Sequence, residues 1–135
     1  MNEYTFTIPT IPPSYNKQFK INFRQRKVYL DHAAKQFVYL AKLSTPNMEV
    51  TEGCVYKLSI EYHSNWFFKN GKVKKQDIQN MDKLLIDAVF EKMGVDDSRV
   101  WEVHLYKVQS TKVYTKVNIK ELECHNSESM VEKSS

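Results

Sequence analysis

The sequence has little of what small chains use for covalent or metal-based folding: two cysteines, three glycines and four prolines in 135 residues. Cys54 and Cys124 are too few for a disulfide scaffold, and their spacing is not that of a zinc site. The neighbouring His125 has no second ligand pair near it, so we expect no metal there. Hydrophobic burial must therefore hold the fold, and 41% apolar residues allow a modest core.

The sequence also lacks a long apolar run and a charged-then-apolar leader. A membrane span needs about 20 consecutive apolar residues, and a secretory leader has an apolar stretch behind basic residues. We therefore expect a soluble, cytoplasmic protein without a membrane partner. No repeat or linker divides the chain, so we expect one domain, residues 1–122, and a polar, disordered tail, residues 123–135.

Residue patterning predicts a single α+β domain of strands and two main helices. The expected order is strand 4–8, helix 32–43, strand 53–67, helix 80–93, strand 100–109 and strand 114–122. Asp31 should cap the first helix and Gly94 should end the second. The last two strands are expected to pair as a hairpin through residues 110–112. Adjacent prolines make residues 11–17 a loop.

Basic residues gather in two segments, and the net charge of +4 favours a polyanionic partner. In residues 19–29 they alternate with aromatic residues, a pattern that suits a surface for nucleic acid. An ordinary solvated hairpin or loop is an equally good interpretation of that segment. The second segment, 69–75, reads as a turn or loop. The candidate DNA-binding residues are Arg24, Arg26, Lys27, Lys72, Lys74 and Lys75.

The predicted helix 80–93 is apolar on most sides and should be buried on most sides. Its narrow polar stripe consists of Asn80, Lys83, Asp87 and Glu91. Polar side chains are disfavoured on a helix that is buried on most sides, so the presence of this stripe requires an explanation. The plain interpretation is that Lys83 and Asp87 form an ordinary pair one turn apart.

Acidic residues flank this helix on both sides. Asp77 precedes it, and a glycine-based turn after it leads to Asp96 and Asp97. If the chain returns along the helix, these carboxylates meet and repel one another unless a cation lies between them. Oxygen ligands of this kind suit Mg²⁺, which also binds phosphate oxygens. An acidic turn that simply faces water is the alternative.

The spacing of these residues resembles the RusA family of Holliday-junction resolvases. Its signature is Asp-x-Asp-Asn, a Lys three residues after the Asn, an Asp-Ala pair in the same helix and a later Asp-Asp. Here these elements are Asp77-Ile78-Gln79-Asn80, Lys83, Asp87-Ala88 and Asp96-Asp97. Residues 12–16, Pro-Pro-Ser-Tyr-Asn, resemble the family's opening loop. The resemblance covers roughly residues 4–122.

The resemblance implies an α/β fold with a mixed sheet, in a homodimer that nicks four-way DNA junctions in recombination and repair. It implies Mg²⁺ as the cofactor, with Mn²⁺ as a substitute, and no nucleotide cofactor. Asp77 and Asp97 match catalytic, metal-binding carboxylates, and Asp96 adds acidity beside them. Lys83 matches the functional lysine. The two remaining motif positions, which match structural roles, are Asn80 and Asp87.

Gln79 stands where the signature has its second Asp. A Gln carbonyl oxygen can bind a metal, but Gln has no negative charge and cannot act as a base. Asp82 lies on a different side of the helix from Lys83, so it is not expected to replace that Asp. Two interpretations stay open: a nuclease that works with three aspartates, or a non-catalytic binder of branched DNA or RNA. A basic domain for a protein partner would require an accidental motif match.

Overall fold

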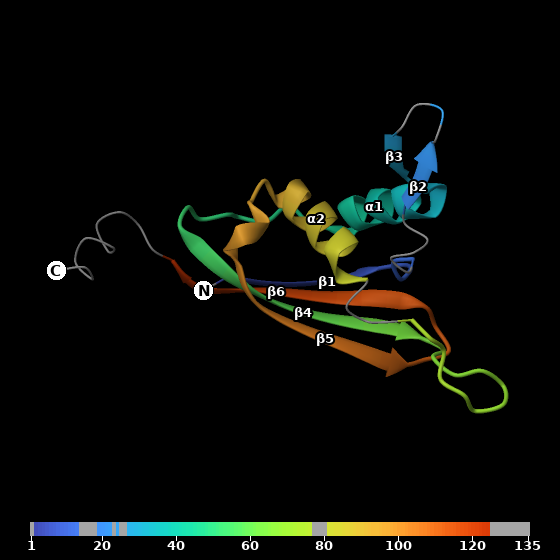
Figure 1. Cartoon of the computed structure of the whole chain (residues 1–135). Coiled ribbons are helices and arrows are strands. Elements are labelled where there is room, and N and C mark those ends of the chain that lie inside the picture. Colours follow the sequence, from blue (N-terminus) through green and yellow to red (C-terminus); the bar gives the residue numbers. More distant parts are fainter. Residues whose placement is uncertain (1, 14–18, 23, 25–26, 77–80, 125–135) are drawn as a thin grey trace.

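The computed structural model describes residues 2–13, 19–22, 24, 27–76 and 81–124. Its elements are β1 (Glu3–Ile8), β2 (Phe19–Asn22), β3 (Lys27–Leu30), α1 (His32–Ser44), β4 (Cys54–Ser64), α2 (Asp82–Met93), the 3₁₀ turn η3 (Asp97–Arg99), β5 (Val100–Gln109) and β6 (Tyr114–Cys124). Four strands form a mixed sheet, and α1 and α2 lie together over one of its faces (Figure 1). The predicted α+β class is confirmed. Segment 19–29 contains a separate hairpin of β2 and β3.

The last two strands do not pair with each other, so the predicted hairpin is wrong. The sheet order is β1-β6-β4-β5, with β4 parallel to β5 and antiparallel to β6. The link between β5 and β6 crosses the end of β4, where the Ser110 N–H donates to the Ser64 carbonyl (2.9 Å). β4 is the more apolar strand and is buried between neighbours, whereas the largely exposed β5 forms an edge.

Two predicted boundaries also change. Residues 65–67 leave the predicted strand 53–67, and the Trp66 indole N–H reaches back to the carbonyls of Tyr62 and Val108 (3.1 Å each). β6 runs to Cys124, so the first two residues of the expected tail are in the sheet. Residues 125–135 of that tail lie outside the described residues. No described helix is both long and apolar enough to cross a membrane.

The core lies between the two helices and the sheet. α1 contributes Ala34, Phe37 and Ala41, and the sheet contributes the buried side chains Ile8, Leu58, Ile60, Tyr62, Val117 and Ile119. Burial of each large apolar side chain contributes about 1.5–3 kcal/mol. α2 buries Leu84, Leu85, Ala88, Val89 and Phe90, as its apolar faces predicted. Glu91 of its polar stripe pairs with Lys42 of α1 (3.1 Å). Lys83 and Asp87 of the same stripe are exposed.

Both predicted helix caps are confirmed. The Asp31 carboxylate accepts a hydrogen bond from the Ala33 N–H (3.3 Å) at the start of α1. Gly94 ends α2 with φ at 73°, a left-handed conformation that glycine adopts without steric cost. The Val95 N–H then bonds back to the Phe90 carbonyl (3.1 Å). This tight return directs the chain into Asp96, which caps η3, and Asp97, its first residue.

Cys54 and Cys124 form a disulfide, which the sequence did not predict. The two residues are 70 apart in sequence, but they face each other at the end of the antiparallel pairing of β4 with β6. A single disulfide is no scaffold, and strand register rather than cysteine spacing brings this pair together.

Candidate active site

The return after α2 brings Asp97 of η3 beside Asp87 in the middle of α2. Partial burial raises the pKa of Asp87, the charge of Lys83 lowers it, and the charge of Asp97 and a hydrogen bond with it raise it again. The charge of Asp97 therefore disfavours the ionised form of Asp87, and a cation between the two carboxylates would relieve this. Lys83 is exposed on α2, one turn before Asp87, and so belongs to the same site.

The position of Asp97 follows from the length of the turn. Only three residues separate Met93, the last residue of α2, from Asp97. An extended chain spans at most about 3.5 Å per residue, whereas the helix rises 1.5 Å per residue, so the first turn of α2 is roughly 16 Å back from its last residue. A compact turn reaches the middle of the helix instead. The described partner of Asp97 on α2 is therefore Asp87.

Asp96 holds the turn in shape. Its Oδ1 accepts a hydrogen bond from the Ser98 N–H (2.8 Å). This backbone hydrogen bond, with smaller contributions from the Ser98 and Asp97 side chains and from the charge of Arg99, lowers the pKa of Asp96. Asp96 is thus ionised at neutral pH, and one of its two oxygens is already used by the turn.

The described residues do not complete a magnesium site. Among them, Asp87, Asp96 and Asp97 do not form a set of three carboxylates with oxygen atoms within 4.8 Å of one another. Asp77, Gln79 and Asn80 lie outside the described residues. Oxygen-only ligands still fit Mg²⁺, and a further ligand from outside this set is required.

Gln76, directly before Asp77, ties the Pro-Pro loop to this region. Its Nε2 donates to the Pro12 carbonyl (3.3 Å) and lies 3.0 Å from the Met81 sulfur. The loop, Gln76 and α1 line a cavity of about 500 Å³. The proline loop, which opens the motif, and Gln76, which directly precedes Asp77 in the sequence, are therefore neighbours in space. Sequence analysis missed Gln76, because nothing in the pattern marked it.

Asp82 faces the sheet rather than the stripe of Lys83 and Asp87. Its charge, after the larger effect of burial, raises the pKa of the Tyr62 hydroxyl, and burial raises the pKa of Asp82 itself. The Tyr62 hydroxyl is buried without a hydrogen-bond partner in the described structure. Asp82 therefore has its own buried neighbour and lies apart from the described acidic pair.

The described lysines among the predicted DNA-binding residues lie in a different part of the fold from Asp97. Lys72, Lys74 and Lys75 lie in the loop after β4, and η3 precedes the parallel strand β5, so they lie at opposite ends of the sheet (Figure 1). The ten residues of β5 span about 30 Å at roughly 3.3 Å per residue. Arg24 is exposed between β2 and β3. Arg26 and the Lys27 side chain lie outside the described residues.

Replacing Asp87 by Asn is expected to stabilise the fold at neutral pH. Because the folded-state pKa of Asp87 is raised above its unfolded value, its ionised form costs free energy above the folded pKa. This cost disappears as the pH falls below the unfolded pKa of about 4. The urea midpoint of the variant should exceed that of the wild type at about pH 7 and match it at about pH 3. An equal gain at both pH values would contradict an electrostatic origin.

Fold and site together define a small two-layer α+β domain with paired carboxylates and a lysine on the polar stripe of a buried helix. Residues 9–120 match the family described as endodeoxyribonuclease RusA. This match covers most of the chain, which therefore belongs to the RusA family, as the motif predicted, and family membership implies endodeoxyribonuclease activity in general. A search of curated proteins gave no match.

Proposed function

We propose that the protein is an Mg²⁺-dependent endonuclease that nicks four-way DNA junctions. Family membership supports the reaction class. The observation that carries the proposal for this chain is the meeting of Asp97 with Asp87 beside Lys83, where the charge of Asp97 raises the pKa of Asp87. Such a site would bind a divalent cation, which offsets the charge of the carboxylates. The cation and the Lys83 ammonium would then offset the charge of a phosphate.

Asp97, Asp96 and Asp77 are the residues that would hold the cation. When bound, it supplies charge stabilisation for the phosphodiester under attack. Lys83 would contact a phosphate oxygen or orient the attacking water. Asp87 would keep the Lys83 ammonium aligned along the stripe, since the two lie one helical turn apart. Asp96 fixes the turn through its hydrogen bond with the Ser98 N–H, so that Asp97 stays in place.

Two basic surfaces would bind the DNA away from the acidic site. The lysines after β4 lie toward the end of the sheet opposite to η3, which precedes β5. Arg24, Arg26 and Lys27 would contact a further phosphate backbone. This separation suits a substrate whose arms spread across the protein. Phosphate contacts without a base-reading motif favour recognition of branched shape over sequence.

A homodimer is part of the proposal, because paired nicks need two sites. The edge strand β5 supports it: Trp101, Val103 and Tyr106 are all exposed there. An exposed edge with large apolar side chains is a surface that proteins usually cover.

The test is incubation of the purified protein with a labelled four-way junction and a matched linear duplex, with Mg²⁺ or with EDTA. Symmetrically paired, Mg²⁺-dependent nicks in the junction alone are expected. Tight junction binding without any nick would instead favour the second candidate, a non-catalytic binder of branched DNA, which the uncharged Gln79 keeps open. Equal cutting of both substrates would contradict junction selectivity.

A further inference from the structure

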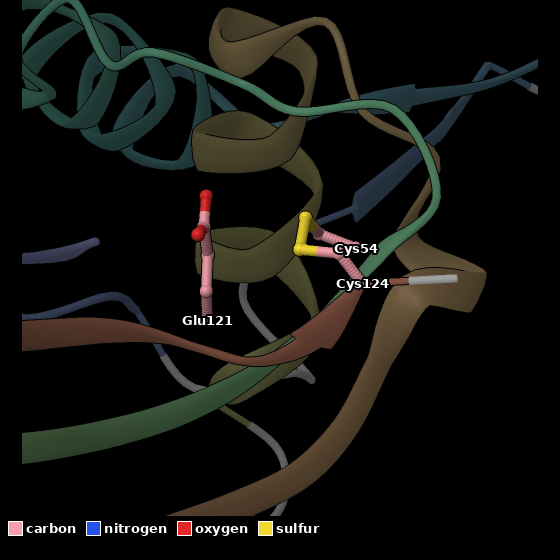
Figure 2. Close-up of side chains that lie close together, drawn as sticks. All are labelled: Cys54, Glu121 and Cys124. Atoms are coloured by element: carbon pink, nitrogen blue, oxygen red, sulfur yellow. A yellow bond between two sulfur atoms is a disulfide. The ribbon is translucent and has the colours of Figure 1, made fainter. Parts of the chain in front are cut away.

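A second group of ligand-type side chains lies at the end of the sheet where β4 begins and β6 ends. The sulfur atoms of Cys54 and Cys124 and a carboxylate oxygen of Glu121 all lie within 4.8 Å of one another. Figure 2 shows the three side chains on the same side of the sheet, beside α2. These residues belong neither to the RusA motif nor to the acidic pair of Asp87 and Asp97.

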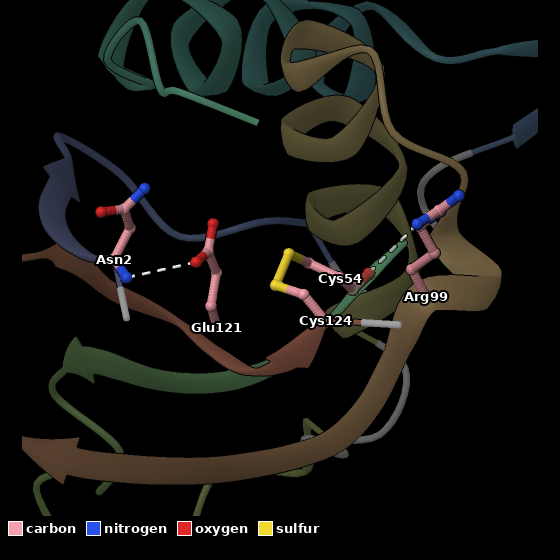
Figure 3. Close-up of a disulfide and its surroundings, with 5 residues drawn as sticks. All are labelled: Asn2, Cys54, Arg99, Glu121 and Cys124. Atoms are coloured by element: carbon pink, nitrogen blue, oxygen red, sulfur yellow. Dashed lines mark hydrogen bonds between the residues drawn. A yellow bond between two sulfur atoms is a disulfide. The ribbon is translucent and has the colours of Figure 1, made fainter. Parts of the chain in front are cut away.

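Glu121 is the unexplained member of this group. Its side chain is 6% exposed, yet its Oε1 is buried without a hydrogen-bond partner in the described structure. Its Oε2 accepts one hydrogen bond, from the Asn2 N–H (3.2 Å; Figure 3). Buried polar atoms are nearly always paired, and an unpaired carboxylate oxygen is costly. A buried carboxylate oxygen that has no hydrogen-bond partner and lies next to two sulfur atoms is therefore a candidate metal ligand.

The nearby charges also favour a cation with thiolate ligands. The Arg99 guanidinium donates to the Cys54 carbonyl (3.3 Å; Figure 3). Two thiolates and one carboxylate around a divalent ion leave one net negative charge, which this guanidinium would offset. The Tyr56 hydroxyl, two residues after Cys54, is also buried without a hydrogen-bond partner in the described structure.

We propose that, once the disulfide is reduced, Cys54, Cys124 and Glu121 form a site for a thiophilic divalent ion of the Zn²⁺ class. A dithiol reductant breaks the S–S bond, becomes a disulfide itself and leaves two cysteine thiols. Each thiol then releases its proton to solvent as the metal binds. Two sulfur ligands and one oxygen ligand suit Zn²⁺, Co²⁺ or Cd²⁺ and disfavour Mg²⁺. Water fills the fourth position.

Such an ion would replace the disulfide as the link between β4 and β6. Under reducing conditions a disulfide does not persist, and the two strand ends would then be joined by hydrogen bonds alone. The metal would keep them together. The site lies next to the turn that carries Asp97, because Arg99, the last residue of η3, donates a hydrogen bond to the Cys54 carbonyl.

The probe is Co²⁺, added to the full chain after chelator treatment and reduction with a phosphine, with excess Mg²⁺ present to occupy acidic sites. The reduced wild type should bind one Co²⁺ per chain, with the near-ultraviolet absorption of a thiolate-to-cobalt transition, and Zn²⁺ should abolish it. The protein with its disulfide intact should show no such band. Glu121→Gln should weaken Co²⁺ binding by roughly tenfold or more, and the matched, exposed Glu102→Gln should leave it unchanged. Cys124→Ser should lose the band.

Two results would overturn the proposal. One is a reduced wild type, with both thiols counted by alkylation, that shows no thiolate-to-cobalt band. The other is a Glu121→Gln variant that binds Co²⁺ as tightly as Glu102→Gln. Neither depends on Cys124→Ser being folded, and circular dichroism of the two glutamate variants checks their folds before the comparison.

Discussion

Asp97→Asn is expected to remove junction nicking while junction binding is kept. The turn after Gly94 delivers this carboxylate to Asp87 and Lys83, and no other acidic residue of η3 takes that position. Asn keeps the size and one ligating oxygen but loses the charge that a cation requires. Loss of one group that stabilises charge in the transition state lowers rates by about 100-fold or more. The nicking rate of a labelled junction in single-turnover experiments measures this effect.

The matched control is Glu102→Gln, which removes an exposed carboxylate from β5 and should nick at the wild-type rate. Junction affinity is measured in Ca²⁺ or EDTA by gel shift. The Asn variant should bind as tightly as the wild type or slightly more tightly, because a negative charge near the phosphates is gone. An Asp97→Asn protein that nicks at the wild-type rate would exclude this residue from the cation site.

The local elements of this fold were predictable because their signals are local. Asp31 caps α1 and Gly94 ends α2 through contacts within a few residues, and the apolar faces of α2 are buried as its pattern required. Strand order was not predictable in this way. The short connection 110–113 reads as a hairpin turn, but β5 lies beside β4 because the more apolar strand takes the centre of the sheet.

The candidate site was predictable in part for the same reason. The motif gave Lys83, Asp87, Asp96 and Asp97, and their spacing gave a return of the chain. Which carboxylate Asp97 meets depends on how far the turn reaches in space. The register of β4 with β6 brings Cys54, Cys124 and Glu121 together, although the two cysteines are 70 residues apart. The spacing of the cysteines in the sequence could not predict this pairing.

Phe90→Ala is expected to destabilise the fold by about 3–5 kcal/mol, the usual cost of removing a buried aromatic ring. Phe90 is 1% exposed, and its ring packs edge-on against Tyr56 of β4, with 5.9 Å between ring centroids. The substitution would leave a cavity between α2 and the central strand. A single domain has a total stability of about 5–15 kcal/mol, so this is a large fraction of it.

Phe68→Ala is the matched control, since it removes the same ring from a side chain that is 53% exposed. Phe68 contacts Lys74, whose Nζ lies 5.8 Å from the ring centroid, so its loss should cost no more than about 1 kcal/mol. Urea unfolding should show the midpoint of Phe90→Ala lowered by about 1 M or more, with that of Phe68→Ala close to the wild type. Equal midpoints for the two variants would mean that α2 does not pack on β4 through Phe90. The support for Lys83 and Asp87, which the same helix carries, would then have to come from elsewhere.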